Sequence, residues 1–564
     1  MKRAHYPLLL ATLVLAACAP SPRSIDSGTA DRPAASAQSN RTLSVVMRVE
    51  PPDMLAGAVD RSAIHKPLFT AALGGWDRND QPFPILAQSL PQLNTDTWRV
   101  LPDGRMETVY KLRPGLTWHD GHPLTVDDFV FTRPTQLYVV ESGLEQIRPE
   151  VREMDDIVAV DSLTVMIRWK RPFSEAAAPE QIIFPRHILE PALLQGDPEA
   201  FRNHAYWTHD YIGAGPYRID RWERGAFIEA TAFEGFALGT PKIQRVRLSW
   251  NNDTNVNMTR LLSGDGDIAL DGSLRFEQAS VLRNQWRENG AVLLSPTSLR
   301  YIQVQARPDY VNPKALLDPR GRKALIHAID RPTLAETMLE DRTMVADTVP
   351  PPTVGYYGEI ERVLTKYPYD LRRTEQLMAE LGYAKGADGV YTSPTDGRFR
   401  VETRGVSSGD EERDTTIVDD YFRAGGFDSF INLLPSSTRA VDDKAKGTFP
   451  GLTLNNNTLQ RGLGLTKWLT SNIGSDADNW VGGNRMGWSN AEFDRLSGEW
   501  TTSLNRAEAT QKLTQMMKLL NEEMPSLPLY FNFRIIAHTA ALQGPEHFTP
   551  EATHYGNIHT WSWR

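Results

Sequence analysis

A single cysteine, Cys18, is the feature that most limits what this 564-residue chain can fold into. One thiol cannot form an internal disulfide, and it cannot build a cysteine-based zinc site, an iron–sulfur cluster or a Cys-x-x-Cys redox centre. The fold must therefore be held by a hydrophobic core. A chain of this length buries enough surface to make such a core without crosslinks, and it is long enough for about three or four domains.

The position of Cys18 is as informative as its rarity. Lys2 and Arg3 precede a mainly apolar run over residues 8–15, and a Leu-Ala-Ala-Cys sequence follows. Charge, a short apolar run and then small residues are typical of a signal peptide, and the run is too short for a transmembrane helix of about 20 residues. Leu-Ala-Ala-Cys resembles the bacterial lipobox. We therefore expect residues 1–17 to be a signal peptide and Cys18 to carry lipid; the alternative is an ordinary signal peptide with a chance cysteine.

The segment after Cys18 predicts a flexible tether. Residues 19–40 contain no aromatic side chain and are rich in Ser, Ala, Pro and Asp. About 22 flexible residues have an end-to-end distance of roughly 25 Å. A globular body beginning near residue 41 would therefore lie close to a membrane surface without entering it.

The charge of the chain excludes some partners. The formal net charge is −9, which argues against nucleic-acid binding, since proteins of that class carry a basic face. Cleavage after residue 17 would remove Lys2 and Arg3 and change the net charge to −11. No segment after the tether offers 18 consecutive uncharged apolar residues, so we expect no transmembrane helix. Lipid is thus the expected attachment to the membrane.

From residue 42 the pattern is mixed α and β. Helices are indicated by their ends: Asp318-Pro319 and Asp370 are capping residues, and Pro525 follows an apolar stripe over residues 513–524. No tryptophan lies between Trp286 and Trp468, which suggests a separate domain from about residue 305. Strand composition occurs at residues 43–49, 108–112, 163–169, 246–250 and 301–305.

Two motifs are candidate sites of chemistry. Residues 405–409 match the G-x-S-x-G nucleophile elbow. A serine nucleophile needs a histidine base, however, and the sequence around the later histidines does not mark any of them as that base. We favour a Gly/Ser-rich connecting loop over a nucleophilic Ser407. His119 and His122 flank an aspartate, yet in an extended segment they point to opposite faces, and a metal site needs three or four convergent ligands. We expect no catalytic residue, metal or cofactor.

A long motif carries the strongest signal. Residues 110–131, Tyr-Lys-Leu-Arg-Pro-Gly-Leu-Thr-Trp-His-Asp-Gly-His-Pro-Leu-Thr-Val-Asp-Asp-Phe-Val-Phe, closely resemble the signature of the family 5 extracellular solute-binding proteins. These are the oligopeptide, dipeptide and nickel receptors of ABC importers. The resemblance covers residues 43–535, and its further pieces follow in the order of the family at 84–87, 213–217, 262–267, 318–325 and 487–494.

The resemblance implies an α/β fold of the periplasmic-binding-protein-like type II class. This is a clamshell of two lobes with an extra domain inserted in lobe I, and the ligand is enclosed where the lobes meet. The implied boundaries are 1–17 for the signal peptide, 18–40 for the tether, 41–75, 206–304 and 529–564 for lobe I, 76–205 for the inserted domain, and 305–528 for lobe II.

The resemblance also suggests where the ligand binds. The signature motif is expected to be scaffold, whereas Glu50 and Met54 follow the first strand and resemble a family segment that contributes to the cleft. The alternative for Glu50 is an exposed acid at a strand end. Peptide receptors have an aspartate near residues 449–460 that pairs with the amino terminus of the peptide. This chain has no acid there and offers Asn455, Asn456 and Asn457, whose neutral amides suit polar ligands unless the loop merely turns.

We therefore expect a lipid-anchored, non-enzymatic receptor of an ABC importer in the cell envelope, on the periplasmic or extracellular face. It would be a monomer that captures a peptide or similar polar solute and delivers it to a membrane permease. An oligosaccharide or nickel cargo on the same fold stays open. The alternatives of other classes are a secreted serine hydrolase using Ser407 and an envelope sensor or chaperone without transport.

Overall fold

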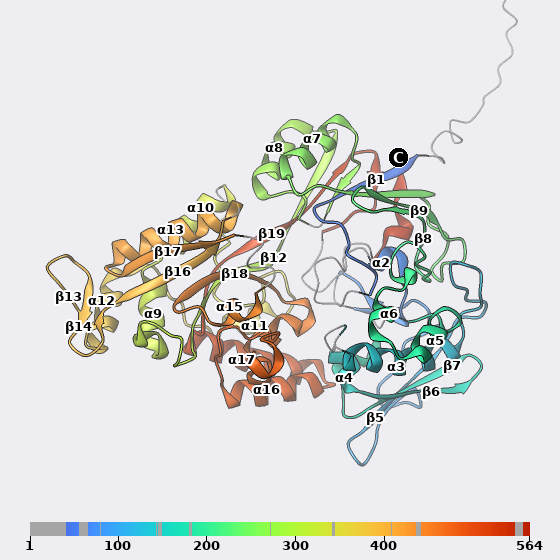
Figure 1. The fold of residues 1–564 in the computed structure, drawn as a ribbon, viewed down its shortest axis with the longest axis horizontal. Helices are drawn as coiled ribbons and strands as arrows, with labels where there is room; N and C mark the ends of the chain where they lie inside the picture. Colours follow the sequence, from blue (N-terminus) through green and yellow to red (C-terminus); the bar gives the residue numbers. More distant parts are fainter. Residues whose placement is uncertain are drawn as a thin grey trace, which may run out of the picture. The chain divides into compact units, whose positions relative to one another are not determined.

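Two long antiparallel strands, β12 (Gly290–Val304) and β19 (Ser526–Thr539), lie in the middle of a ten-stranded mixed sheet in this computed structural model (Figure 1). The strand order is β17-β16-β18-β12-β19-β11-β1-β10-β9-β8. The β1 half comprises β1 (Thr42–Met47), β8 (Tyr217–Glu223), β9 (Phe227–Ala232), β10 (Arg245–Trp250) and β11 (Ile268–Ala269). The β18 half comprises β16 (Arg400–Val406), β17 (Asp428–Leu434) and β18 (Leu452–Thr458).

The structure describes residues 41–55, 66–78, 81–142, 144, 149–179, 183–270, 272–340, 344–407, 409–435, 442–547 and 556–564. Cys18 and the predicted signal peptide and tether lie outside these residues. None of the helices within them combines the length and the apolar character that crossing a bilayer requires.

A second sheet belongs to the segment that follows the first strand of the large sheet. It is antiparallel, has the order β4-β5-β7-β6, and packs against α3 (Val126–Glu141). Its strands are β4 (Trp98–Val100), β5 (Met106–Lys111), β6 (Met154–Asp161) and β7 (Thr164–Trp169). The short strands elsewhere are β2 (Gly74–Trp76), β3 (Pro82–Pro84), β13 (Ala384–Lys385), β14 (Tyr391–Ser393), β15 (Gly397–Arg398), β20 (Leu542–Gln543) and β21 (Ser562–Trp563).

The helices fall on both sides of residue 305. Before it lie α2 (Lys66–Phe69), α4 (Pro149–Glu153), α5 (Arg186–Gln195), α6 (Pro198–Arg202), α7 (Thr254–Ser263) and α8 (Phe276–Trp286). After it lie α9 (Pro319–His327), α10 (Arg331–Leu339), α11 (Tyr357–Glu361), α12 (Leu371–Glu380), α13 (Gly409–Gly425), α15 (Asp443–Gly447), α16 (Ala491–Thr502) and α17 (Arg506–Glu523). Short 3-10 turns occur at 174–177, 205–207, 314–317, 460–468, 470–472, 476–478 and 558–560.

Local sequence signals position these elements. Asp318 accepts a hydrogen bond from the Arg320 amide at the start of α9, and Asp370 accepts two at the start of α12, which confirms both predicted caps. The apolar stripe over residues 513–524 lies along α17 as predicted, and Met524 ends the helix in the left-handed conformation just before a proline.

The signature motif is scaffold, as expected. It runs from β5 through two turns, at Gly115 and Gly121, into α3; both glycines lie at positive φ, at 72° and 84°. Trp118 is buried in the core of the small sheet, and its indole N–H donates to Asp128 at 3.4 Å. The motif therefore joins the small sheet to α3.

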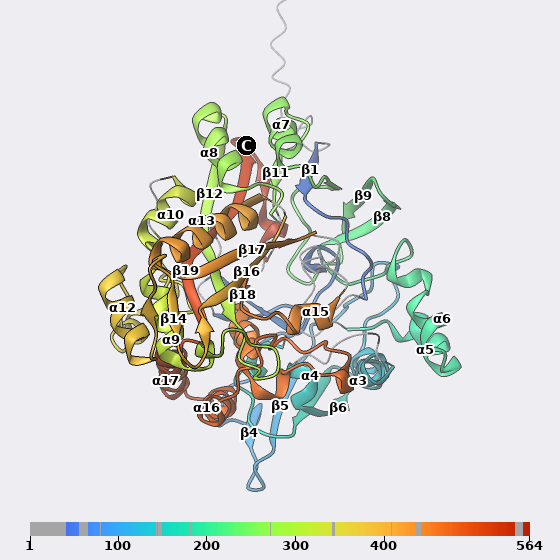
Figure 2. The same ribbon diagram turned by 60° about the vertical axis from the view of Figure 1, so that its left-hand side comes forward.

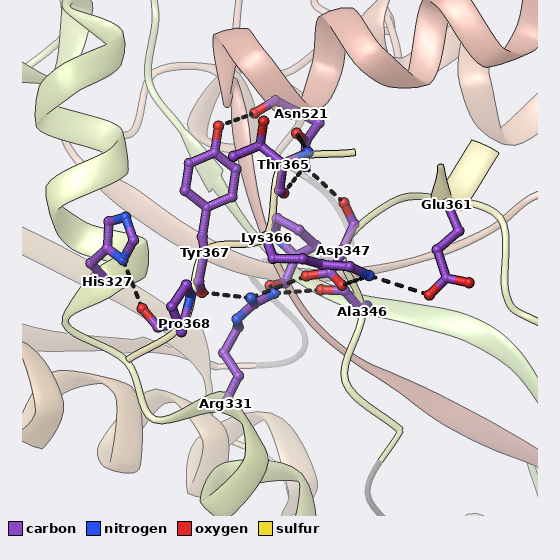
Figure 3. A network of polar contacts seen from close by, with 11 residues as sticks. His327, Arg331, Ala346, Asp347, Glu361, Thr365, Lys366, Tyr367, Pro368 and Asn521 are labelled. Atoms are coloured by element: carbon purple, nitrogen blue, oxygen red, sulfur yellow. Dashed lines mark hydrogen bonds and ion pairs between the residues drawn. The ribbon is translucent and has the colours of Figure 1, made fainter. Parts of the chain in front are cut away.

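In the β18 half, helices cover both faces of the sheet (Figures 1 and 2). Because side chains alternate along a strand, one face of β12 packs Leu299 and Tyr301 against α16 and α17, and the other packs Ile302 and Val304 against α9, α10, α12 and α13. A polar network around the buried Arg331, at the start of α10, ties these helices to β19 (Figure 3). Both faces of the half-sheet are thus core, and polar residues there need partners within the protein.

Candidate functional site

A pocket opens on the face of the sheet that carries α16 and α17. Strands β12, β16 and β18 form its floor, since Arg404 of β16 lies beside Thr453 of β18, which pairs with Gln303 of β12. β17, α15, the segment that follows α15 and the loop before α16 supply the remaining walls. The lining residues are Gln303, Arg404, Gly405, Leu434, Ala445, Lys446, Phe449, Thr453, Asn455 and Arg485.

The charge of this lining has one sign. Arg404, Lys446 and Arg485 are cationic, and among the described residues no carboxylate lines the pocket. Arg404 pairs with Glu402 at 2.7 Å and Lys446 pairs with Asp443 at 2.6 Å, but neither acid lines the pocket. The Arg404 and Lys446 side chains are only 15% and 13% exposed, so their interactions are poorly screened by water. Arg404 also donates to the Ala445 carbonyl at 3.1 Å, so partners within the chain hold the cationic side chains of the lining in place.

The three predicted asparagines do not act together. Asn455 lines the pocket, and its amide nitrogen donates to Gln303 at 3.1 Å. Asn457 points to the same face but is buried, and its amide donates to the Gly464 carbonyl at 3.0 Å, which holds the turn after β18. Asn456 points to the opposite face because side chains alternate. A ligand-binding role stays a prediction for all three, and the pocket geometry favours Asn455.

Glu50 and Met54 lie in the β1 half, where other residues of the chain occupy them. The Glu50 carboxylate accepts hydrogen bonds from the Trp222 indole at 3.1 Å and the Gly225 amide at 3.0 Å, and it pairs with Arg224 at 3.4 Å. It therefore fastens the turn between β8 and β9. Met54 is 2% exposed and packs in the hydrophobic core of the β1 half. Their predicted contribution to a cleft stays a prediction.

The two histidines of the signature motif are separated. His119 is buried: its Nδ1 accepts from the Gly213 amide at 3.2 Å, and its Nε2 lies 3.0 Å from the Gly215 carbonyl. His122 instead stacks on His187, with 4.0 Å between ring centroids. In the described part of the chain, no three His, Cys, Asp or Glu side chains are grouped so as to hold a metal ion.

The environment of His119 predicts a pH effect on stability. Burial disfavours the charged ring and lowers the pKa of His119 from 6.5 to about 4. The folded protein therefore binds fewer protons than the unfolded chain between these values, and its stability falls as pH drops from 6.5 towards 4. We expect the loss to be about 2–3 kcal/mol. Urea unfolding should measure the free energy of unfolding of wild type and His119→Gln at pH 7.5 and 4.5. We expect the difference between the two proteins to be smaller at pH 4.5 by this amount. An equal change in both proteins would contradict the assignment.

Ser407 lies on the predicted strand-to-helix turn, between β16 and α13. Its hydroxyl donates to the Leu434 carbonyl at 3.4 Å, and its amide donates to the same oxygen at 2.9 Å. Among the residues that the structure describes, no histidine hydrogen-bonds to Ser407. The hydroxyl therefore has no base there to activate it.

The three pocket cations were missed by sequence reasoning. They are separated by about 40 residues from one another along the chain and lie on a strand, a short helix and a loop. Only the pairing of β16 with β18 brings Arg404 next to the predicted segment.

Comparisons with known proteins agree with this picture. The family model described as bacterial extracellular solute-binding proteins, family 5 Middle, matches residues 88–459. The glutathione-binding protein GsiB of Escherichia coli K12 is 24% identical over 507 residues, which are 87% of this chain and 88% of that protein.

Solved structures share the fold. The oligopeptide-binding protein of Thermus thermophilus, complexed with a pentapeptide, has a TM-score of 0.75 and 22% identity, covering 93% of this chain and 96% of that one. NikZ of Campylobacter jejuni, in complex with Ni(L-His), has a TM-score of 0.74 and 20% identity, covering 92% and 99%. The predicted α/β fold of the periplasmic-binding-protein-like type II class is thereby confirmed. Since the family model spans more than half of the sequence, the chain belongs to the bacterial extracellular solute-binding proteins, family 5.

Proposed function

We propose that this protein is the receptor of an ABC importer for a small polar solute that carries a carboxylate, with peptides as the principal class. The observation that carries the proposal is the pocket whose charged lining residues, in the part of the chain that the structure describes, are Arg404, Lys446 and Arg485. Guanidinium and ammonium groups bind carboxylates through charge-assisted hydrogen bonds, which are about twice as strong as neutral ones. An uncharged oligosaccharide would leave three partly buried cations without this gain.

The relatives support this class of solute. Glutathione, a pentapeptide and a nickel–histidine complex are named for them, and each of these molecules carries a carboxylate. Residues 449–460 contain no acid to pair with an ammonium group, so we infer that the solute is held by its acidic end. Asn455, Thr453 and Gln303 add neutral hydrogen-bonding groups, which orient a ligand without demanding one side chain.

The proposal includes the architecture and the attachment. Two lobes would close on the solute without catalysis, and a membrane permease would then receive it. They are lobe I (41–75, 206–304, 529–564), with its inserted domain (76–205), and lobe II (305–528).

Lipid on Cys18 would hold a monomeric receptor at the membrane surface of the cell envelope. Labelling cells with a radioactive fatty acid tests the anchor: we expect incorporation into wild type and none into Cys18→Ser, whereas label retained by the variant would exclude this anchor.

Replacing Arg404 tests the pocket directly. Isothermal calorimetry should compare trialanine with its C-terminal amide, which differ by one negative charge. We expect wild type to prefer the free carboxylate and Arg404→Met to lose about tenfold to a hundredfold in affinity for it, because one charge-assisted hydrogen bond is worth about 1.5–3 kcal/mol. Affinity for the amide should change little.

Arg398→Met is the matched control. Arg398 lies six residues earlier, is 46% exposed, and pairs with Asp388 and Asp428 outside the pocket. The Arg398→Met variant should bind trialanine and its amide with the affinities of wild type. Equal binding of the two probes by wild type would count against the anionic pocket. Native mass spectrometry of the receptor purified from its own host would identify the cargo, and a neutral sugar as the single co-purifying solute would overturn the proposal.

A further inference from the structure

Arg307 lies behind the pocket and makes an unusual set of contacts. Its Nη1 donates to the Gly447 carbonyl at 2.8 Å and to the Arg485 carbonyl at 2.5 Å. Its Nη2 donates to the carbonyls of Gly474 and Asn484, each at 3.3 Å. One guanidinium thus joins the end of α15 to two separate points of the 472–487 segment.

These carbonyls belong to the walls of the pocket. Gly447 follows Lys446 directly in the chain, and Arg485 itself lines the pocket, so Arg307 binds the backbone beside both cations. The side chain is half-buried, and within the described part of the chain no carboxylate pairs with it. Burial lowers the pKa of Arg307. Carbonyl oxygens are dipoles and do not neutralise the charge of a guanidinium as a carboxylate would. The hydrogen bonds of Arg307 therefore serve to hold these backbone segments in a fixed arrangement.

The surroundings are shaped around this side chain. Arg307 lies over the ring of Trp480, with 5.3 Å from its Cζ to the ring centroid. Gly487 has φ +72°, and a Cβ there would come within 2.3 Å of the Arg307 Cγ. Trp480 also has positive φ, at 61°, which is rare for a bulky residue and persists only when neighbours fix it. The segment is therefore held in a conformation that it would not adopt alone.

We propose that Arg307 is the positioning residue of the pocket: by binding four backbone carbonyls, it fixes α15 and the 472–487 segment so that Lys446 and Arg485 face one anionic group. This inference rests on the proposed function, since it concerns the same pocket. Lysine cannot replace arginine here, because a single ammonium nitrogen cannot reach carbonyls spread over a planar fork. Geometry, and not charge alone, sets the preference for an anion.

Hydrogen–deuterium exchange on the ligand-free protein tests the positioning. Arg307→Met and Arg307→Lys should both raise exchange about tenfold in residues 443–449 and 472–487, while the rest of the described chain is unchanged. Gly487→Ala provides a second route if these variants fold poorly, since its methyl group displaces Arg307 and leaves the charge. Arg495→Met, an exposed arginine of α16, is the control and should leave both segments as in wild type. Unchanged exchange in these segments for the folded Arg307 variants would overturn the inference.

Binding separates this inference from the function itself. With trialanine and its amide as probes, we expect the carboxylate preference of wild type to fall about tenfold in Arg307→Met and equally in Arg307→Lys. Full rescue by lysine would show that the charge suffices and would overturn positioning. If wild type itself shows no carboxylate preference, the proposed function fails, and the exchange data still decide the role of Arg307.

Discussion

Asp414→Ala is expected to destabilise the folded protein by about 3–5 kcal/mol, since it removes one partner of a buried ion pair. Asp414 is fully buried on α13 and lies 2.5 Å from the Arg300 Nε of β12, which is itself buried. The Tyr530 hydroxyl of β19 donates to the same carboxylate at 2.9 Å. The substitution would leave the Arg300 guanidinium buried, and among the described residues Glu411, at 3.6 Å, would be its remaining acidic partner. Urea unfolding followed by circular dichroism would measure the loss.

Two further variants make the test of Asp414 specific. Asp410→Ala changes a partly exposed aspartate on the same helix, whose ion pair with Arg413 should be worth less than about 1 kcal/mol. Arg300→Met combined with Asp414→Ala removes both charges, and this double variant should be more stable than Asp414→Ala alone. If Asp414→Ala were as mild as Asp410→Ala, or if the double variant showed the sum of two large losses, the pair would not be coupled as described.

The consequence reaches the pocket. Arg300 and Gln303 lie on opposite faces of β12, and α13 begins soon after Gly405, which lines the pocket. The Arg300–Asp414 pair therefore holds one side of the same strands whose other side forms the pocket floor. Removing this pair with Asp414→Ala should therefore lower the affinity for a carboxylate as well as the free energy of unfolding.

Signals confined to one short segment could be predicted from the sequence. Asp318 and Asp370 each cap a helix because the acceptor and the amide lie two residues apart, so no distant part of the chain is needed. The family resemblance predicts that the signature motif is scaffold, and Trp118 is buried accordingly. The order of strands in the large sheet joins segments far apart in the chain, such as β11 and β19, and no local pattern specifies it.

Signals that depend on distant pairing could not be predicted. In the run Asn455–Asn457, a shift of one residue in register would exchange which side chains reach the pocket, and the sequence does not set that register. Glu50 looked available for a ligand because its partners, Trp222 and Gly225, come from a turn about 170 residues later. The sequence alone does not distinguish a carboxylate that has three partners within the chain from a carboxylate that faces a ligand.

The polar network of Figure 3 carries the second large effect. Arg331 is buried at the start of α10 and donates to the carbonyls of Ala346 at 2.5 Å and Tyr367 at 2.8 Å, and more weakly to Pro528 of β19 at 3.2 Å. Its guanidinium also pairs with Asp347 at 3.1 Å. In Figure 3 the side chain reaches between these segments, and Asp347 lies between Arg331 and Lys366.

Arg331→Ala should therefore cost about 3–5 kcal/mol of unfolding free energy, since three buried carbonyls would lose a charged donor at once. Lys366 would still pair with Asp347 at 2.8 Å, so the carboxylate would not be left alone, and the backbone carbonyls account for most of the loss. Arg331→Lys should recover only part of this free energy, because a single ammonium nitrogen cannot reach all the carbonyls that the planar guanidinium contacts. Arg373→Ala, an exposed arginine on α12, should change the free energy by less than about 1 kcal/mol. Equal urea midpoints for Arg331→Ala and Arg373→Ala would mean that the network contributes no more than a surface pair, and that packing alone holds α10 against β19.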